Sequence, residues 1–441
     1  MALPPGPKSS RLHQTLRWLL RPIPFMEDCR RTYGEAFSVI FVGFKTPMVL
    51  VSDPEAVKAI YTERANGMPP GRSIVLEPVM GPRSILLLEG KDHMARRKVM
   101  LPPFHGEHMR SYEAVMREAI TTEIDSWKVG DTFPIHPRMQ SVTLEVILGA
   151  VFGVTDPARL ARLRALLGQV LSDTASPMLQ LAGFATQRFK YGPWAVFQEH
   201  VGAVDRELLG LIAERRAEAD LESREDILSS LIAAKFEDGD GMTDAEVRDQ
   251  LMTLLLAGHE TTATALAWTF DLLLGNPATL ERLVAELAAD DGDEYMRATI
   301  SEGLRLRPVV PIAGRRLSAD LSVNGLELPA GTDVAPAMWL THTRPDVYPD
   351  PYAFKPERFL DSPPDTYAWI PFGGGVRRCL GAAFAEFEMR IVLAEVLRRC
   401  RLAAGGDGAQ HMTRRNITLS PREGTPVTLL SREPAREPVP A

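Results

Sequence analysis

One stretch decides the fold, Pro371-Phe372-Gly373-Gly374-Gly375-Val376-Arg377-Arg378-Cys379-Leu380-Gly381. Three consecutive glycines leave the backbone free to adopt positive φ angles, so the loop can turn back and direct several N–H groups at one point. Residues 382–397 follow, with good helix formers and apolar residues at helical spacing. The pattern predicts a loop that presents the thiol of Cys379 at the N-terminus of a helix.

A metal ion is the partner that best suits this thiol. The helix dipole contributes only ~0.3–1 kcal/mol when exposed and up to ~2 kcal/mol when partly buried, which is too little to keep a buried thiol ionised. Coordination to a metal deprotonates a thiol outright. Zinc and iron–sulfur sites need two to four Cys or His at short spacing, and Cys29 and Cys400 stand in no such pattern.

A single cysteine ligand therefore suggests haem. Two other interpretations of the bare residue stay open at this point. Cys379 could be a nucleophile with a distant histidine base, or a small buried hydrophobe.

Composition describes an ordinary globular chain of 441 residues, 45% hydrophobic and 24% charged, which is long enough for one large domain or two or three smaller ones. Three cysteines, a small and odd number, indicate a reducing compartment. The N-terminal residues have neither the pattern of a secretory leader nor a bilayer-spanning apolar run, so we expect a cytoplasmic protein with no membrane anchor. A net charge of −7 argues against a nucleic-acid partner.

Local patterns predict a mainly α fold with small β-sheets. Two strands are expected over 37–42 and 48–51, before a helix that Ser52, Asp53 and Pro54 begin and that ends near Thr62. Amphipathic helices separated by short breaks follow over 91–235. Further small sheets are expected over 318–336 and 417–429, and 432–441 is a polar, frayed tail. Two irregular, apolar segments, 65–90 and 176–193, are candidates for covering a pocket.

A long helix is predicted in the middle of the chain. Thr243 and Glu246 form a capping box that starts it, and Gly275 and Pro277 stop it. Its length of ~45 Å would cross a whole domain. One stripe of this helix carries mostly small residues, which would let a planar group approach the helix closely. The stripe consists of Leu254, Ala257, Gly258, Thr261 and Ala265.

Beside this stripe, Glu260 and Thr261 place an acid next to an alcohol, where Gly258 weakens the helix. Such a pair can relay protons to bound oxygen. The alternative is that the Thr261 hydroxyl bonds back to the carbonyl of Ala257 while Glu260 faces solvent. We interpret His259, which directly precedes Glu260, as a structural residue.

Two charged pairs have helical spacing. Glu302 and Arg305 stand three residues apart and can form an ion pair, which contributes little if it is exposed. His93 and Arg97 stand four apart on one helix face, where they could bind the anionic propionates of a haem.

Phe372, Gly375, Arg377, Cys379 and Gly381 have the spacing F-x-x-G-x-R-x-C-x-G, which resembles the haem-binding signature of the cytochrome P450 (haem-thiolate) monooxygenases. Three more motifs are similar to those of this family and occur in its order: A-G-x-[DE]-T-T at 257–262, E-x-x-R at 302–305 and P-E-R-F at 356–359. The resemblance implies a single domain over 1–441 with a long central helix over the haem. It also implies a smaller β-containing part at about 34–62 and 318–340.

The resemblance also implies roles for individual residues. Cys379 would be the axial ligand of haem b, Phe372 would shield its sulfur, and Glu260 and Thr261 would deliver protons. A buried network of Glu302, Arg305 and Arg358 would hold the haem loop. The remaining cofactor contacts would come from His93, Arg97, Arg315 (with Arg316 as its rival), Arg377, Gly381, Ala257 and Gly258.

Substrate and partners follow from the same resemblance. Apolar residues at Val75, Leu254, Val309, Val310 and Ile417 would line a pocket for a hydrophobic substrate such as a steroid, terpenoid or fatty acid. O₂ would be the co-substrate, with electrons from NAD(P)H through a ferredoxin reductase and a ferredoxin, since no G-x-G-x-x-G follows a strand.

A basic cluster of Arg96, Lys98 and Arg378 would dock an acidic ferredoxin. The alternatives left open are a haem-thiolate peroxygenase or isomerase, and a haem-binding protein without turnover.

Overall fold

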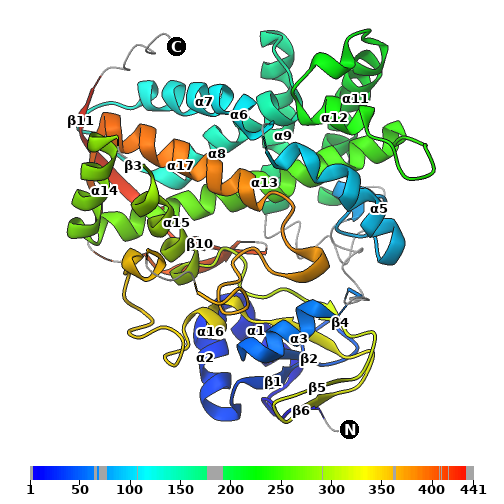
Figure 1. Ribbon diagram of the computed structural model, residues 1–441, viewed down its shortest axis with the longest axis vertical. Coiled ribbons are helices and arrows are strands. Elements are labelled where there is room, and N and C mark those ends of the chain that lie inside the picture. Colours follow the sequence, from blue (N-terminus) through cyan, green and yellow to red (C-terminus); the bar gives the residue numbers. More distant parts are fainter. Residues whose placement is uncertain are drawn as a thin grey trace. The chain divides into compact units, whose positions relative to one another are not determined.

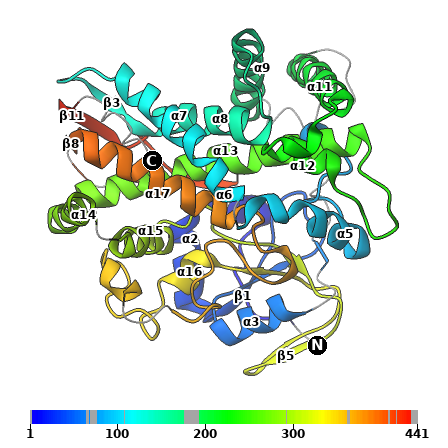
Figure 2. The same cartoon turned by 45° about the horizontal axis from the view of Figure 1, so that its top comes forward.

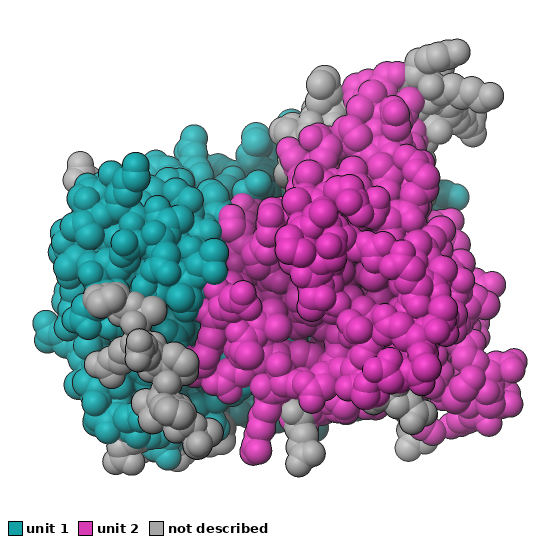
Figure 3. Space-filling model, turned by 90° about the horizontal axis from the view of Figure 1, so that it is seen from above, with its two compact units in different colours: residues 1–70, 120–139, 261–441 teal, residues 71–119, 140–260 magenta. Residues whose placement is uncertain are grey.

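The computed structural model describes residues 3–63, 67–68, 77–106, 108–175, 192–290, 292–360, 364–406, 408, 410–415 and 417–433. The chain forms two compact units, shown in different colours in Figure 3. Unit 1 comprises residues 1–70, 120–139 and 261–441, and unit 2 comprises 71–119 and 140–260. Helices dominate both units and the sheets are small, which confirms the predicted fold class.

A four-stranded sheet organises the N-terminal part of unit 1. Its order is β1-β2-β7-β4, with β1 and β2 antiparallel and β2 parallel to β7. The sheet joins the two β-containing segments that the sequence predicts, although they are almost 300 residues apart. The strands are β1 (Ala36–Val39), β2 (Met48–Val51), β4 (Arg315–Arg316) and β7 (Asp333–Pro336), and the neighbouring elements are α1 (Arg11–Leu20), α2 (Pro22–Tyr33), α3 (Pro54–Thr62) and the hairpin β5 (Leu321–Val323)–β6 (Leu326–Leu328) (Figure 1).

The predicted strand 37–42 ends early, at Val39, for a physical reason. The backbone N–H of Ile40 donates to the side chain of Gln14, and that of Val42 donates to the hydroxyl of Thr15. Both acceptors lie on α1, so a helix satisfies backbone groups that a strand partner would otherwise have bonded. The start of α3 is as predicted, with the Asp53 carboxylate accepting from the N–H of Ala56.

The rest of unit 1 is helical, with two small sheets near the C-terminus. The predicted strands at 417–429 are present, while the partners β3, β8 and β9 are not in the prediction. Strands in these sheets are β3 (Thr132–Pro134), β8 (Cys400–Ala404), β9 (Met412–Arg415), β10 (Thr418–Pro421) and β11 (Pro426–Arg432). The helices are α14 (Pro277–Ala289), α15 (Glu294–Leu306), α16 (Met338–His342), α17 (Ala382–Arg399) and the short η4 (Pro356–Phe359) and η5 (Gly375–Arg377).

Unit 2 is built from helices, as the pattern over 91–235 predicts. A buried ion pair joins Arg215 to Asp226 at 2.6 Å, and Ser229 is bonded to both side chains. Residues 65–66 and 69–76 of the predicted cover at 65–90, and residues 176–191 of the segment 176–193, lie outside the described residues. The helices are α5 (Gly90–Met100), η1 (Pro102–Phe104), α6 (His108–Ser111), α7 (Glu113–Ser126), α8 (Ile135–Val146), η2 (Ile147–Val151), α9 (Pro157–Ala175), α11 (Pro193–Ala217), η3 (Leu221–Ser223) and α12 (Ile227–Ala233), of which α7 and α8 continue into unit 1.

The long helix α13 (Asp244–Leu274) has 31 residues and contributes to both units (Figure 2). The N–H of Thr243 donates to the Glu246 carboxylate at 3.0 Å, and the N–H of Glu246 donates to the Thr243 hydroxyl at 3.3 Å. This reciprocal pair is the predicted capping box. Within the described part of the chain, we find no helix that is long and apolar enough to cross a membrane.

Candidate active site

The cysteine loop has the backbone geometry that its glycines predict. Gly373 and Gly375 adopt φ angles of +67° and +64°, and the N–H of Cys379 donates to the carbonyl of Phe372 at 2.9 Å. These turns close the loop just before α17, whose N-cap is Gly381. Cys379 lies on the surface of the loop with its side chain exposed.

The other two cysteines are unsuited to ligation. Cys29 and Cys400 are buried, and burial raises the pKa of each thiol to about 11, so both are protonated at neutral pH. Cys379 is therefore the cysteine that can present a thiolate to a metal ion.

Tyr61 of α3 packs against the glycines of the loop, which the sequence analysis missed. A Cβ atom on Gly374 would lie 2.4 Å from Cδ2 of the Tyr61 ring, and one on Gly375 would lie 2.1 Å from the backbone oxygen of Tyr61. Only glycine fits such close approaches. No short-range signal in the sequence indicates this contact, because more than 300 residues separate its two sides.

Arg315 and Tyr61 form a buried donor pair suited to an anion. The guanidinium carbon of Arg315 lies 5.5 Å from the centre of the Tyr61 ring, and burial lowers the pKa of this arginine. The Tyr61 hydroxyl is buried without a hydrogen-bond partner among the described residues, and burial raises its pKa to about 12. A buried cation next to an unused hydroxyl donor fits a carboxylate such as a haem propionate.

The neighbouring Arg316 is less suited to this role. Its guanidinium is bound to both carboxylate oxygens of Asp333, at 2.8 and 2.9 Å. The geometry thus favours Arg315 over its rival as the propionate ligand.

Glu302, Arg305 and Arg358 lie together, as the resemblance implies. Two N–H groups of Arg305 donate to the two carboxylate oxygens of Glu302, at 2.6 and 2.8 Å, and both residues are fully buried. Arg358 adds a longer bond of 3.3 Å to the same carboxylate, and the N–H of Lys355 donates to it at 2.9 Å. The pair is therefore a buried, bidentate one and not the exposed pair that spacing alone would allow.

His342 connects this network to the cysteine loop, and it too was missed. Its Nε2 accepts from the N–H of Ile370 at 2.9 Å, so its Nδ1 carries the proton and donates to the carbonyl of Arg305 at 3.1 Å. Burial lowers the pKa of His342 to about 3, which keeps the ring neutral. Since Ile370 directly precedes Pro371, this histidine fixes the chain where the loop begins.

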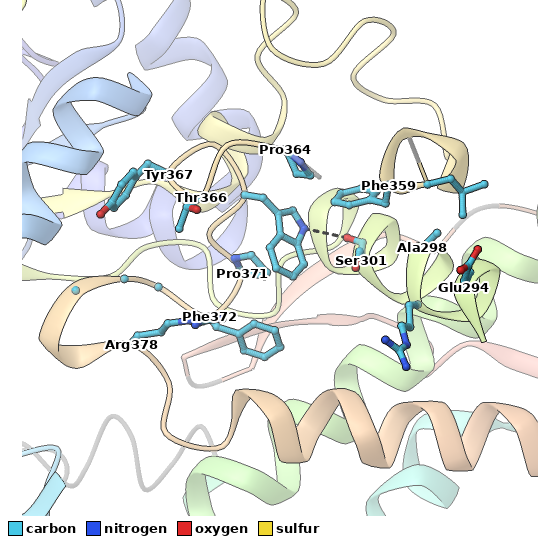
Figure 4. A pocket seen from close by; sticks show the side chains of 16 residues that line it. Glu294, Ala298, Ser301, Phe359, Pro364, Thr366, Tyr367, Pro371, Phe372 and Arg378 are labelled. Carbon is cyan, nitrogen blue, oxygen red and sulfur yellow. Dashed lines mark hydrogen bonds between the residues drawn. The ribbon is translucent and has the colours of Figure 1, made fainter. Parts of the chain in front are cut away.

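Aromatic side chains support the other flank of the loop. Phe372 contacts Trp369 edge-on with 6.2 Å between ring centres, and Trp369 contacts Phe359 in the same way at 5.9 Å. The indole N–H of Trp369 donates to the carbonyl of Ser301 on α15, the bond drawn in Figure 4. These rings line an open pocket of about 610 Å³ that borders the loop.

In unit 2, α5 carries the predicted pair His93 and Arg97, of which His93 is buried. The nearby Arg96 has its guanidinium 2.6 Å from the Glu246 carboxylate and is largely covered. Lys98 is exposed and pairs with Glu237 at 2.7 Å. Of the predicted basic cluster, Lys98 and Arg378 are exposed, although Lys98 is paired with Glu237, whereas Arg96 is largely covered and paired with Glu246.

On α13, the Glu260 carboxylate accepts a bond of 2.5 Å from the side-chain amide of Gln140 on α8. Ala257 is exposed, and Leu254, Gly258 and Thr261 are half-buried, whereas Leu255 and Thr262 beside them are buried. The predicted stripe of small residues is therefore accessible from Leu254 to Thr261, whereas its last member, Ala265, is buried. This is the surface that a flat cofactor requires. His259 is buried.

The predicted substrate-contacting residues differ in their surroundings. Val309 is buried and Val310 half-buried, and the carbonyl of Val309 accepts from the N–H of Leu419 on β10. Ile417, in the turn before β10, has 58% of its surface exposed. Val75 lies outside the described residues.

An accessible cysteine on a glycine-turned loop, in a mainly helical chain, points to the class of haem-thiolate enzymes. The chain belongs to the cytochrome P450 family, whose model matches residues 4–427. It is therefore a cytochrome P450 enzyme, a monooxygenase and oxidoreductase, and its family implies haem as the cofactor.

Curated mycobacterial proteins are similar over nearly the whole chain. The protein described as cytochrome P450 135B1 of Mycobacterium tuberculosis is 39% identical over 430 residues, which cover 96% of this chain and 90% of that protein. Cytochrome P450 135A1 of the same organism is 36% identical over 432 residues, with 97% and 95% of the two chains covered.

Solved structures show the same fold. The retinoic acid-bound cyanobacterial CYP120A1 matches with a TM-score of 0.84 and 24% identity, covering 98% of this chain and 100% of that one. The heme domain of cytochrome P450DA matches with a TM-score of 0.86 and 22% identity, covering 98% and 99%.

We predict that Arg305→Ala destabilises the folded protein by about 3–5 kcal/mol, because it leaves the buried carboxylate of Glu302 without its bidentate partner. Denaturant unfolding measures the loss, and the haem content after purification should fall with it. The matched control is Arg297→Ala on the same helix, which removes an exposed pair with Asp293 and should cost less than about 1 kcal/mol. An Arg305→Ala protein with full haem content and an unchanged unfolding midpoint would contradict the proposed importance of this network.

Proposed function

We propose that this cytochrome P450 hydroxylates a hydrophobic small molecule, such as a steroid, terpenoid or fatty acid, with electrons from an external ferredoxin. The observation that carries the proposal is the exposed Cys379 on its positive-φ loop, in a chain that keeps an acid and an alcohol side by side on α13. We further propose that both compact units belong to one catalytic domain, since a single family model spans them.

Haem b supplies, when bound, the activation of O₂ and the transfer of one oxygen atom into a C–H bond. In our proposal Cys379 would hold this haem through its sulfur, and Phe372 would shield that sulfur. Arg315, aided by the Tyr61 hydroxyl, binds one propionate through charge-assisted hydrogen bonds. Arg377, His93 and Arg97 would bind the propionates as well, and Ala257, Gly258 and Gly381 would allow the ring to approach closely.

Glu260 and Thr261 hold the protons that oxygen cleavage consumes. The amide of Gln140 donates to the Glu260 carboxylate, which restrains this side chain. A carboxylate can take protons from solvent and pass them to the neighbouring hydroxyl of Thr261, which becomes the immediate donor. The half-buried position of both residues gives them access to a ligand on the small-residue stripe.

The proposed substrate class rests on the apolar character of Leu254, Val309, Val310 and Ile417. A pocket with such walls binds a ligand mainly through the apolar surface that it removes from water. Retinoic acid is a rational member of a first ligand panel, because it is the ligand in the similarly folded cyanobacterial protein.

The electron donor in our proposal is a ferredoxin, reduced by NAD(P)H through a ferredoxin reductase. Exposed basic side chains at Lys98 and Arg378, on a chain of net charge −7, favour an acidic partner. We propose the cytoplasm as the site of action, because the cysteine ligand must stay reduced and the small number of cysteines is typical of a reducing compartment.

We expect the dithionite-reduced protein to give, with carbon monoxide, the Soret band of a thiolate-ligated ferrous complex. Cys379→His should move the band to the position of an imidazole-ligated haem, because it exchanges the ligating atom. The matched control Cys400→Ser changes a buried thiol and should leave the band in place in folded protein. An imidazole-type band in the wild-type protein would exclude the proposed ligand and the mechanism that depends on it.

We expect Glu260→Gln and Thr261→Ala to lower product formation by about a hundred-fold, the lower range for a positioned proton donor. NAD(P)H consumption should fall much less, so that the ratio of product to NAD(P)H drops and peroxide accumulates. Thr262→Ala, at the buried neighbouring position, is the control and should leave this ratio unchanged. Unaltered ratios in both variants would show that the pair does not deliver protons.

We expect the double charge reversal Lys98→Glu and Arg378→Glu to slow reduction by an acidic ferredoxin, most strongly at low ionic strength. Stopped-flow reduction under carbon monoxide measures the rate. A double reversal at exposed arginines elsewhere, Arg31→Glu and Arg422→Glu, controls for net charge. Equal reduction rates in all three proteins would refute docking at Lys98 and Arg378.

A further inference from the structure

Helix α1 has an apolar face that the fold leaves exposed. Gln14 and Trp18 point into the protein and are buried. Four leucines lie on another side of the helix at the spacing i, i+4, i+7 and i+8, which places them on one face. Their exposed fractions are 60% for Leu12, 46% for Leu16, 44% for Leu19 and 74% for Leu20.

A loop between β1 and β2 extends this surface. Val42 and Phe44 in that loop are 55% and 37% exposed. The N–H of Val42 donates to the hydroxyl of Thr15 at 2.9 Å, and Arg11 donates to the carbonyl of Phe44 at 3.5 Å, so the loop is bonded to α1. We call the six residues Leu12, Leu16, Leu19, Leu20, Val42 and Phe44 the leucine face.

The leucine face is held rigidly outward. The side-chain amide of Gln14 donates to the carbonyls of Pro7 and Ser9, and its oxygen accepts from the N–H of Ile40. Trp18 belongs to the core cluster beneath the four-stranded sheet, and its ring contacts Phe41 at 5.6 Å. The helix cannot rotate to bury its leucines without breaking these contacts. Single exposed leucines are common, but a contiguous set of this kind marks an interaction surface.

The charge around the leucine face identifies its partner. The first acidic residue of the chain is Glu27, so all the charged side chains of residues 1–26 are positive. The whole protein, in contrast, has a net charge of −7. Lys8, Arg11 and Arg21 are exposed beside the helix, and Lys45 is exposed beside Phe44 in the loop. Arg17 is engaged with Asp28 at 2.6 Å. An apolar face bordered by basic residues is the pattern of a helix that lies in the interface of an anionic membrane.

We propose that the leucine face seats this protein on an anionic lipid surface. The ten residues of α1 are too short to span a bilayer, so the helix lies parallel to it, with the leucines among the upper acyl chains and the basic residues at the headgroups. A second copy of the chain is the less suitable occupant, because a two-fold contact through this face would bring two basic borders together.

The test is sedimentation of the full-length holoprotein with vesicles of phosphatidylglycerol and phosphatidylcholine, and with vesicles of phosphatidylcholine alone. We expect binding to the anionic vesicles that weakens as salt is raised, and much weaker binding to the neutral ones. The double variant Leu16→Glu and Leu20→Glu should lower the partition coefficient at least about ten-fold, because it removes two apolar contacts and adds repulsion.

The matched control is Leu209→Glu with Leu430→Glu, two leucines that are 41% and 57% exposed elsewhere on the chain. It adds the same charge and should bind as the wild type does. Unchanged carbon monoxide spectra show that both double variants remain folded holoproteins, and the readout needs no turnover, so it is independent of the proposed substrate.

Three results would overturn the proposal. The wild type could stay in the supernatant with both kinds of vesicle, or the Leu16→Glu and Leu20→Glu variant could sediment as the wild type does. In the third, gel filtration shows a wild-type dimer that this variant loses, while neither protein binds vesicles. The leucine face would then be a contact between copies of the chain.

Discussion

The buried bonds of Arg305 are the constraint on which the cysteine loop depends. All five N–H donors of this guanidinium are used, two on Glu302 and the others on the carbonyls of His342, Pro351 and Ala353. A buried ion pair is weak evidence for added stability, because its desolvation offsets much of its attraction. Its value here is positional, since one planar cation fixes α15 and the chain segments that lead to Pro371 in a single arrangement.

Features encoded by neighbouring residues could be predicted from the sequence. The capping box of α13 needs only Thr243 and Glu246, and the positive φ angles of Gly373 and Gly375 follow from the missing side chains. The family resemblance predicted that Glu302, Arg305 and Arg358 lie together in a buried network. The spacing of Glu302 and Arg305 alone did not decide whether their ion pair is exposed or buried. The functional roles given to His93, Arg97, Glu260 and Thr261 stay predictions.

Contacts between distant segments could not be predicted in this way. The pairing of Arg316 with Asp333 and the two ring bonds of His342 depend on how the chain is folded, and neither residue type nor local spacing indicates them. The same limit explains the strand that ends at Val39. Its sequence continues to favour a strand, but side chains of α1, more than twenty residues away, satisfy the next backbone groups.

The contact between Gly375 and α3 limits which substitutions this loop can accept during evolution. The atom that a Cβ would strike is the backbone oxygen of residue 61, which every amino acid possesses. No compensating substitution at Tyr61 could therefore make room for a side chain at 375, and only a shift of the α3 backbone could. The helix and the loop must therefore change position together, so the position of the Cys379 side chain depends on the path of α3.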